Sequence, residues 1–170
     1  MSSPFELLEL PATYALEEEQ INAALRSKSI IHHPDRFANA SEEEIQSAEK
    51  SMAELNHAHA KLNSPLKRAF ALLSFYDKPC NAEETVKDTE FLMEMFEINE
   101  ELSEAKKSQE EENIKKILED LKAQEVALID DLHLQFSIWE EKNNSLECLP
   151  KINEMLMRLQ YLTKLIEDNT

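Results

Sequence analysis

The complete absence of glycine is the feature that most constrains this chain. None of its 170 residues is a glycine. Loops that cradle phosphate groups need backbone that adopts positive φ angles or approaches a ligand closely, and glycine supplies both properties. A Walker loop and a Rossmann fingerprint are therefore both missing. We expect no nucleotide binding through either device.

Charge and cysteine content exclude further classes of protein. The formal net charge is −17, which makes nucleic acid a poor partner, because binding it relies on Lys and Arg to neutralise phosphates. The acidity serves either solubility alone or charge-guided recognition of a basic partner. Cys80 and Cys148 are isolated from each other. This excludes a disulfide framework and a four-cysteine zinc site, and favours a reducing compartment.

Membrane insertion and export are not indicated either. The apolar runs are only a few residues long, too short to span a bilayer. The first ten residues, MSSPFELLEL, contain no basic side chain and place Glu6 and Glu9 among leucines, unlike a secretory signal or a transit peptide. We expect a cytoplasmic protein.

Helical periodicity dominates the first half of the chain, and strand signals are almost missing. The segment FELLELP predicts a short element closed by Pro11, and a helix is expected from about residue 17 to 32, where Pro34 stops it. A third helix begins at Ser41, which forms a capping box pattern with Glu44. Pro65 opens a further short helix.

Two of these helices carry an apolar stripe. The inner face of the helix over 17–32 consists of Ile21, Ala24, Leu25 and Ile31. The stripe of the third helix has 3-4-3-4-3 spacing, as expected for one helix face, and consists of Ile45, Ala48, Met52, Leu55, His59 and Leu62.

A domain boundary is expected where the periodicity lapses. We assign residues 1–76 to an N-terminal domain, 77–84 to a linker and 85–170 to a C-terminal three-helix bundle. The bundle helices are predicted at about 84–104, 109–143 and 149–168, with connections short enough for antiparallel neighbours. Charge changes across the boundary, from net −4 in residues 1–76 to net −13 in residues 77–170. The predicted fold class is all-α.

The stretch SIIHHPDRF, residues 29–37, permits several interpretations. His32 and His33 are adjacent and diverge, whereas helical metal ligands favour i, i+4 spacing. His57 and His59 form a second potential pair, although His59 lies on the apolar stripe. His33 and Asp35 would suit acid–base chemistry, but no nucleophile or oxyanion device accompanies them. A plain loop, with a proline that stops the helix and a capping aspartate, remains the simplest alternative.

The setting of this tripeptide resembles a J-domain. Two antiparallel helices, joined by a loop that starts with His33, Pro34 and Asp35, follow the segment FELLELPATYALEEEQI. The resemblance implies a domain that binds a DnaK-type ATPase chaperone through this tripeptide and stimulates its ATP hydrolysis. J-domains are not enzymes themselves, so no catalytic residue is expected.

A narrower resemblance covers nearly the whole chain. The segments LPATY, HPDRFA, SPLKRAFALLS and VKDTEFLMEMFEINEEL resemble the HscB family of J-domain co-chaperones in iron–sulfur cluster assembly. This implies that a C-terminal three-helix bundle binds the scaffold protein IscU and presents it to the chaperone HscA. No cysteine-rich extension precedes the J-domain, so we expect the bacterial form, with no cofactor and no bound metal.

Two positions depart from the family pattern. The chaperone-docking helix is sparsely basic and offers Arg26 and Lys28, with Arg36 just beyond it. Glu9 stands where the family has an early glycine, so we expect that turn to use a conformation other than the one glycine favours.

A second surface follows from the residues of the bundle themselves. In a helix over 90–102, Phe91, Met95, Ile98 and Leu102 form one packing stripe. The surplus residues on other faces are Leu92, Met93 and Phe96, beside Glu97 and Glu100. This surplus indicates either a contact with the N-terminal domain or a binding patch with a carboxylate rim.

The last helix shows a similar surplus. Its packing face is expected to consist of Ile152, Met155, Leu156, Leu159, Leu162 and Ile166, while Met157, Tyr161 and Leu165 lie nearly opposite. Phe136 and Trp139 of the middle helix are expected in the core. The HscB resemblance implies that the scaffold-binding residues are Leu92, Met93, Phe96, Glu97, Glu100 and Tyr161. The alternatives are a structural adaptor with an incidental tripeptide, a generic J-domain protein with a different client and, less favoured, an enzyme that uses His33 and Asp35.

Overall fold

The fold is helical throughout the part of the chain that the structure describes. The computed structural model describes residues 2–32, 41–78 and 88–170, and within these ranges it contains helices and turns but no strand. The expected all-α class is confirmed. The chain divides into two compact units, Met1–Pro79 and Cys80–Thr170. Residues 33–36, which carry the His-Pro-Asp tripeptide and Arg36, lie outside the described residues.

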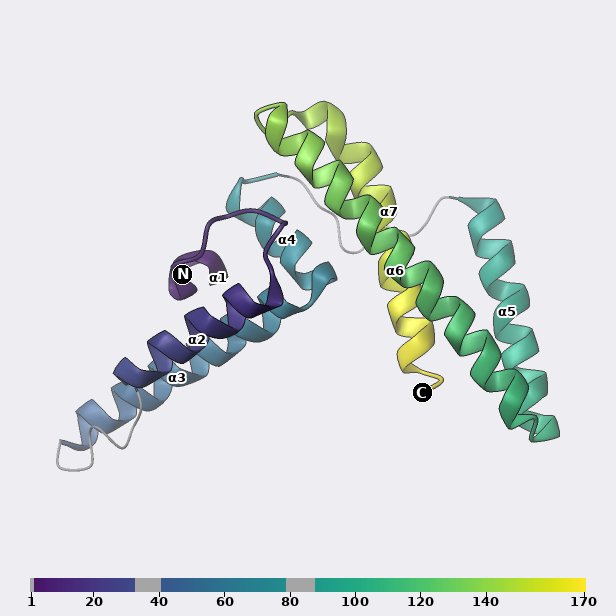
Figure 1. Ribbon diagram of the computed structural model, residues 1–170, viewed down its shortest axis with the longest axis horizontal. Helices are drawn as coiled ribbons and strands as arrows, with labels where there is room; N and C mark the ends of the chain where they lie inside the picture. Colours follow the sequence, from purple (N-terminus) through teal and green to yellow (C-terminus); the bar gives the residue numbers. More distant parts are fainter. Residues whose placement is uncertain (1, 33–40, 79–87) are drawn as a thin grey trace. The chain divides into compact units, whose positions relative to one another are not determined.

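The N-terminal unit is a helical hairpin with two short flanking helices. The helices are α1 (Pro4–Leu8), α2 (Glu18–His32), α3 (Glu42–Asn63) and α4 (Pro65–Phe75). Figure 1 shows α2 and α3 side by side along their length, and both α1 and α4 contact α3. The largest fully buried side chains of this unit are Phe5, Leu8, Tyr14, Ile21, Leu62, Leu72 and Leu73. The prediction that Ile31 lies on the inner face of this helix is wrong, because its side chain is exposed in the last turn of α2.

The helix starts in this unit follow from side-chain caps. The predicted capping box at α3 is confirmed: the backbone N–H of Ser41 donates to Glu44 Oε2 at 2.9 Å, and the N–H of Glu44 donates to Ser41 Oγ at 3.4 Å. The Ser41 donor holds the pKa of the Glu44 carboxyl below its usual value. Ser3 and Glu6 form a second capping box at α1. These caps satisfy N–H groups that have no partner inside the helix.

Turns with positive φ form here without glycine. Glu9 ends α1 with φ 54° and ψ 39°, the left-handed conformation that glycine favours, so the expectation of another conformation at this turn is wrong. The Glu9 N–H donates to the carbonyl of Glu6, and its carboxylate forms an ion pair with Lys28. Other residues with positive φ are Asp77, Gln109, Asn143 and Asn144.

A buried arginine organises the segment between α1 and α2. Arg68 of α4 is 6% exposed; its Nε donates to the carbonyl of Leu62 at 2.7 Å, and its Nη1 donates to the carbonyls of Tyr14 and Leu16, both at 2.9 Å. The guanidinium also lies over the Tyr14 ring, 5.6 Å from its centroid. Burial lowers the pKa of Arg68 and raises the pKa of Tyr14 to about 12. Arg68 thus satisfies carbonyl groups that no helix can satisfy.

The C-terminal unit consists of three long helices and one short turn. They are α5 (Thr89–Ser108), α6 (Glu111–Glu141), the 3-10 helix η2 (Leu146–Cys148) and α7 (Leu149–Glu167). The three predicted bundle helices are therefore present. The helix α5 begins later than expected because Asp88 caps it, accepting from the N–H groups of Glu90 and Phe91. It ends at Ser108, and the left-handed backbone of Gln109 caps this end.

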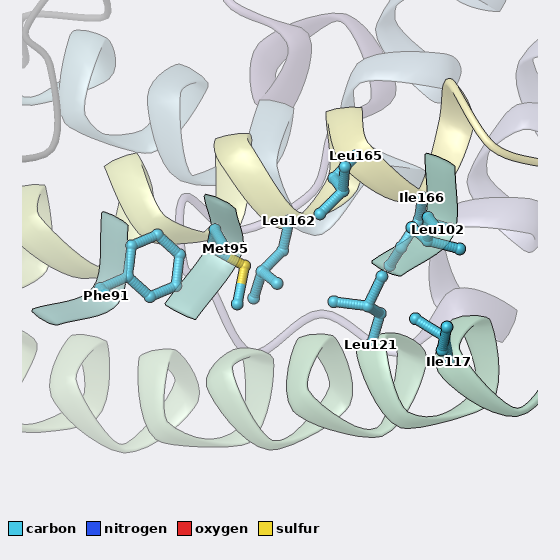
Figure 2. Close-up of a cluster of buried hydrophobic side chains, with 8 residues drawn as sticks. All are labelled: Phe91, Met95, Leu102, Ile117, Leu121, Leu162, Leu165 and Ile166. Atoms are coloured by element: carbon cyan, nitrogen blue, oxygen red, sulfur yellow. The ribbon is translucent and has the colours of Figure 1, made fainter. Parts of the chain in front are cut away.

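One hydrophobic cluster joins the three helices. Figure 2 shows side chains from α5, α6 and α7 that converge in the interior of this unit. The buried members are Phe91, Met95, Leu102, Ile117, Leu121, Leu162, Leu165 and Ile166, and Ile98 packs against them partly buried. This matches the packing stripe expected for residues 90–102. Phe136 and Trp139 are fully buried elsewhere in the unit, with ring centroids 5.8 Å apart, as predicted.

The helix α7 is buried on more sides than expected. All six residues of its predicted packing face are buried, but Met157 and Leu165, predicted to lie on a surplus face, are buried as well, 6% and 8% exposed. Leu165 belongs to the cluster in Figure 2. Because α7 packs against more than one neighbour, a second apolar face does not imply a free surface. Of the three surplus residues, Tyr161 alone is exposed.

Candidate functional site

Two basic side chains in the described part of the N-terminal unit form ion pairs with acidic neighbours. Arg26 Nη2 lies 2.7 Å from Glu19 Oε1 on the same helix, and both side chains are largely exposed. Lys28, whose side chain is 20% exposed, forms an ion pair with Glu9. The two basic side chains predicted to dock a chaperone thus already neutralise acidic neighbours. His33, Pro34, Asp35 and Arg36 fall outside the described ranges.

The second histidine pair is not arranged as a metal site. His59 bridges α2 and α3: its Nε2 lies 2.7 Å from Asn22 Oδ1 and 3.1 Å from Asn63 Nδ2. His57 is exposed on another side of α3. Among the described residues, no group of three or more His, Cys, Asp or Glu side chains could hold a metal ion. His59 therefore serves as a hydrogen-bonding residue of the helix hairpin.

The helix α5 presents two opposite surfaces with different character. Phe91, Met95 and Leu102 face the interior, whereas Leu92, Met93 and Phe96 are 37%, 62% and 60% exposed. Phe96 lies four positions after Leu92 and three after Met93, so it shares a region of the helix surface with each of them. Exposed large apolar side chains gathered in this way mark an interaction site more often than scattered single ones do.

The exposed residues of α5 also border a shallow hollow. A cavity of about 210 Å³ is lined by Thr89, Leu92, Met93, Phe96 and Glu97. It lies entirely on the first half of α5. Its lining is apolar except for the threonine and the glutamate at its edge. Such a hollow accepts an apolar side chain of another molecule, with a carboxylate next to it.

Three further predicted residues lie at or beside this surface. Glu97 and Glu100 are exposed on α5, and Tyr161 of α7 is 37% exposed. The ring of Tyr161 makes an edge-to-face contact with the ring of Phe91, with centroids 6.0 Å apart and planes at 79°. Phe91 precedes Leu92 in the sequence, so this contact brings the exposed tyrosine close to the start of the α5 surface. We call Leu92, Met93, Phe96 and Tyr161, with the carboxylates of Glu97 and Glu100, the α5–α7 surface.

Sequence reasoning missed an ion pair that borders this surface. Asp88, just before α5, pairs with Arg158 of α7. A capping role of Asp88 was detectable, because aspartate before a helical stretch is a typical N-cap. Its pairing with Arg158 was not, since the partners are 70 residues apart in the chain. Sequence reasoning also did not consider the exposed apolar residues Val126 and Leu134 of α6.

No helix among the described residues is both long and apolar enough to cross a membrane. This agrees with the short apolar runs of the sequence.

Comparison with known proteins relates this chain to HscB. Residues 87–168 match the family model described as the HSCB C-terminal oligomerisation domain. The structure is similar to the chaperone HscB from Vibrio cholerae, with a TM-score of 0.80 and 27% identity over 99% of this chain and 95% of that one. It shares its fold with human co-chaperone protein HscB, with a TM-score of 0.82 and 24% identity over 99% of this chain and 81% of the human one. The C-terminal residues thus match the HscB family, and the chain as a whole is similar in structure to the chaperone HscB.

Proposed function

We propose that this protein binds an IscU-type iron–sulfur scaffold protein through the α5–α7 surface and delivers it to an HscA-type chaperone. The J-domain then stimulates ATP hydrolysis by that chaperone during cluster assembly and transfer. The observation that carries the proposal is the exposure of Leu92, Met93 and Phe96 on a helix whose opposite side is buried. Similarity to HscB supports the class of client.

The apolar residues would provide most of the binding free energy for the scaffold. Met93 and Phe96 are more than half exposed, so a partner that covers them removes much apolar surface from water. Methionine and aromatic side chains suit an adaptable hydrophobic contact. Glu97 and Glu100 stand at the rim, where carboxylates attract basic side chains and speed association. Tyr161 adds an aromatic ring from α7 next to this patch.

The chaperone would bind the other unit. His33, Pro34 and Asp35 would contact the ATPase, and Arg26, Lys28 and Arg36 would attract its acidic face. Arg26 and Lys28 form ion pairs with Glu19 and Glu9 in the free protein. Docking therefore exchanges these internal pairs for new ones, and the gain per cation is modest because exposed pairs contribute about 0–1 kcal/mol. The tripeptide then carries the specific part of the contact.

The chemistry belongs to the partner in this scheme. ATP is hydrolysed by the chaperone and the cluster is held by the scaffold, so this chain needs no catalytic residue, no cofactor and no metal of its own. Nucleic acid and membranes are not among the proposed partners. The proposed location is the bacterial cytoplasm, where both protein partners would be found.

Single-turnover ATP hydrolysis by an HscA-type chaperone tests the proposal. The full-length protein should accelerate hydrolysis, and the scaffold should increase the effect further. His33→Gln and Asp35→Asn should abolish stimulation while circular dichroism shows an unchanged helix content. Calorimetric titration with the IscU-type scaffold should give the same affinity for these variants as for the wild type.

Two outcomes contradict the proposal. Near-normal stimulation by a folded His33→Gln variant removes the J-domain role. Scaffold binding without any ATPase stimulation by the wild-type chain favours a structural adaptor instead.

A further inference from the structure

The carboxylate of Asp88 binds both the first turn of α5 and a side chain of α7. Asp88 Oδ1 accepts hydrogen bonds from the backbone N–H groups of Glu90 at 3.0 Å and Phe91 at 3.1 Å. The other oxygen, Oδ2, forms an ion pair with Arg158 of α7. One side chain thus caps α5 and ties the capped end to another helix. An exposed N-cap needs only the first of these interactions.

Arg158 makes further contacts at the same place. Its Nη2 also lies 3.0 Å from Glu154 Oε1, one turn earlier on α7. Its guanidinium carbon lies 5.5 Å from the centroid of the Phe91 ring, and that ring in turn contacts Tyr161. We call Asp88, Phe91, Arg158 and Tyr161 the α5–α7 bracket. It joins the start of α5 to the part of α7 that carries Tyr161.

The bracket has a geometric consequence for the α5–α7 surface. Leu92, Met93 and Phe96 occupy the two turns that follow the cap, and Tyr161 is the α7 residue of the surface. Successive side chains of an α-helix point in directions that differ by a constant rotation. If the first turn of α5 is held in place, the directions of Leu92, Met93 and Phe96 are therefore set as well. The side chains of Asp88 and Arg158 are 26% and 33% exposed, so solvent and salt screen the pair only in part.

We propose that Asp88 and Arg158 are positioning residues that set the orientation of the first half of α5 against α7. They thereby preorganise the apolar surface formed by Leu92, Met93, Phe96 and Tyr161 before a partner binds. Preorganisation raises affinity because the partner does not have to order the helix itself. The part of this inference that concerns the scaffold protein rests on the proposed function.

Paired variants separate positioning from capping. Asp88→Asn keeps an N-cap side chain that accepts from N–H groups but removes the charge that Arg158 needs. Asp88→Ala removes both. Arg158→Met keeps much of the aliphatic length that covers Phe91, and Arg158→Lys restores the charge without the planar guanidinium. Lys115→Met serves as a matched control, because it removes an exposed cation from an ion pair with Glu119 on α6.

Hydrogen–deuterium exchange and calorimetry read out these variants in the full-length protein. Asp88→Asn and Arg158→Met should raise amide exchange in residues 89–97 but not in 98–108. Their affinity for the IscU-type scaffold should fall by about three- to tenfold, the range of a partly exposed charge pair. Arg158→Lys should recover part of both effects, and Asp88→Asn combined with Arg158→Met should lose no more than either single variant.

Several results would overturn the inference. If Asp88→Asn exchanges like the wild type and only Asp88→Ala loosens the helix, capping alone explains the cluster. Additive losses in the combined variant would show that the two side chains act independently. Raised exchange with unchanged scaffold affinity would remove the preorganising role.

If the wild-type chain does not bind the scaffold, the proposed function fails. The comparison of Asp88→Asn with Asp88→Ala by exchange then still decides whether Arg158 positions α5.

Discussion

The two units of this protein are stabilised in different ways. In the N-terminal unit a buried cation, Arg68, binds three backbone carbonyls, and His59 links α2 to α3 through Asn22. In the described residues of the C-terminal unit the buried side chains are apolar, and the polar ties between helices lie near the surface, as Asp88 with Arg158 and Thr163 with Glu125 do.

The difference follows from the backbone. The N-terminal unit contains a non-helical segment between α1 and α2, whose carbonyls have no helical partner and need a donor inside the fold. The bundle consists of long regular helices that satisfy their own backbone groups, so apolar packing suffices. Apolar residues beyond that packing, such as Met93 and Phe96, then remain available to a partner.

The largest expected effect is a loss of stability of the N-terminal unit when Arg68 is replaced. Arg68→Met leaves the buried carbonyls of Leu16 and Leu62 without the Arg68 donor, while the Tyr14 carbonyl keeps only the N–H of Leu16. It should reduce the free energy of unfolding of this unit by about 3 kcal/mol. Urea unfolding followed by circular dichroism should show an early transition. Fluorescence of Trp139, the one tryptophan of the chain, reports on the bundle. This signal should show that the bundle unfolds at an unchanged urea concentration.

Lys67→Met is the matched control, because Lys67 is exposed on the same helix and should change the stability by less than about 0.5 kcal/mol. Equal stability of the two variants would show that Arg68 does not hold the unit together.

The next effect concerns the surface of the bundle rather than its core. Leu92→Ala combined with Phe96→Ala should weaken scaffold binding by about 2 kcal/mol or more, roughly thirtyfold, at any ionic strength. The melting temperature should hardly change, because both side chains are exposed. Calorimetric titration at two salt concentrations and a thermal melt measure both quantities.

Val126→Ala combined with Leu134→Ala is the control, since it truncates two exposed apolar residues of α6. A strongly lowered melting temperature of the α5 variant, with residual binding unchanged, would place the patch in a core or domain contact.

Alkaline pH should lower the stability of the N-terminal unit through Tyr14. The folded-state pKa of Tyr14 is about 12, raised by burial above its usual value of 10. Between pH 10 and pH 12 the unfolded chain loses the Tyr14 proton more readily than the folded one, so the free energy of unfolding falls as the pH rises. The contribution of Tyr14 is complete below pH 10 and is reduced by about 1 kcal/mol at pH 11. Tyr14→Phe has no such group, so its stability should decline less between pH 9 and pH 11. Parallel pH profiles for both proteins in urea unfolding would contradict this assignment.

The smallest expected effect lies at the acidic rim of the α5–α7 surface. Glu97→Ala combined with Glu100→Ala should reduce scaffold affinity by about threefold at low salt and hardly at all at high salt, since exposed charges are screened. Asp120→Ala combined with Asp131→Ala removes the same charge from α6 and is the control. Equal losses in both pairs would indicate a general effect of net charge, and a loss that persists at high salt would indicate direct, desolvated contacts.

Much of the fold could be predicted because its signals are local. The capping box of Ser41 and Glu44 and the burial of Phe91, Met95 and Leu102 follow from residues a few positions apart. The burial of Met157 and Leu165 could not be predicted, because it depends on how many neighbours α7 has. The left-handed turn at Glu9 was also missed, since a glutamate gives no local sign of positive φ.

For the candidate site, the division between sequence and structure is similar. The surplus of apolar residues on α5 is a property of helical periodicity, so the sequence by itself determined that Leu92, Met93 and Phe96 do not belong to the packing stripe. The sequence also determined the all-α class and the positions of the bundle helices. Only the tertiary structure decided that Tyr161 alone is exposed among the surplus residues of α7, and that Arg158 reaches Asp88. The physical reason is that periodicity assigns a side chain to a helix face, whereas burial and ion pairing depend on which distant segment packs against that face.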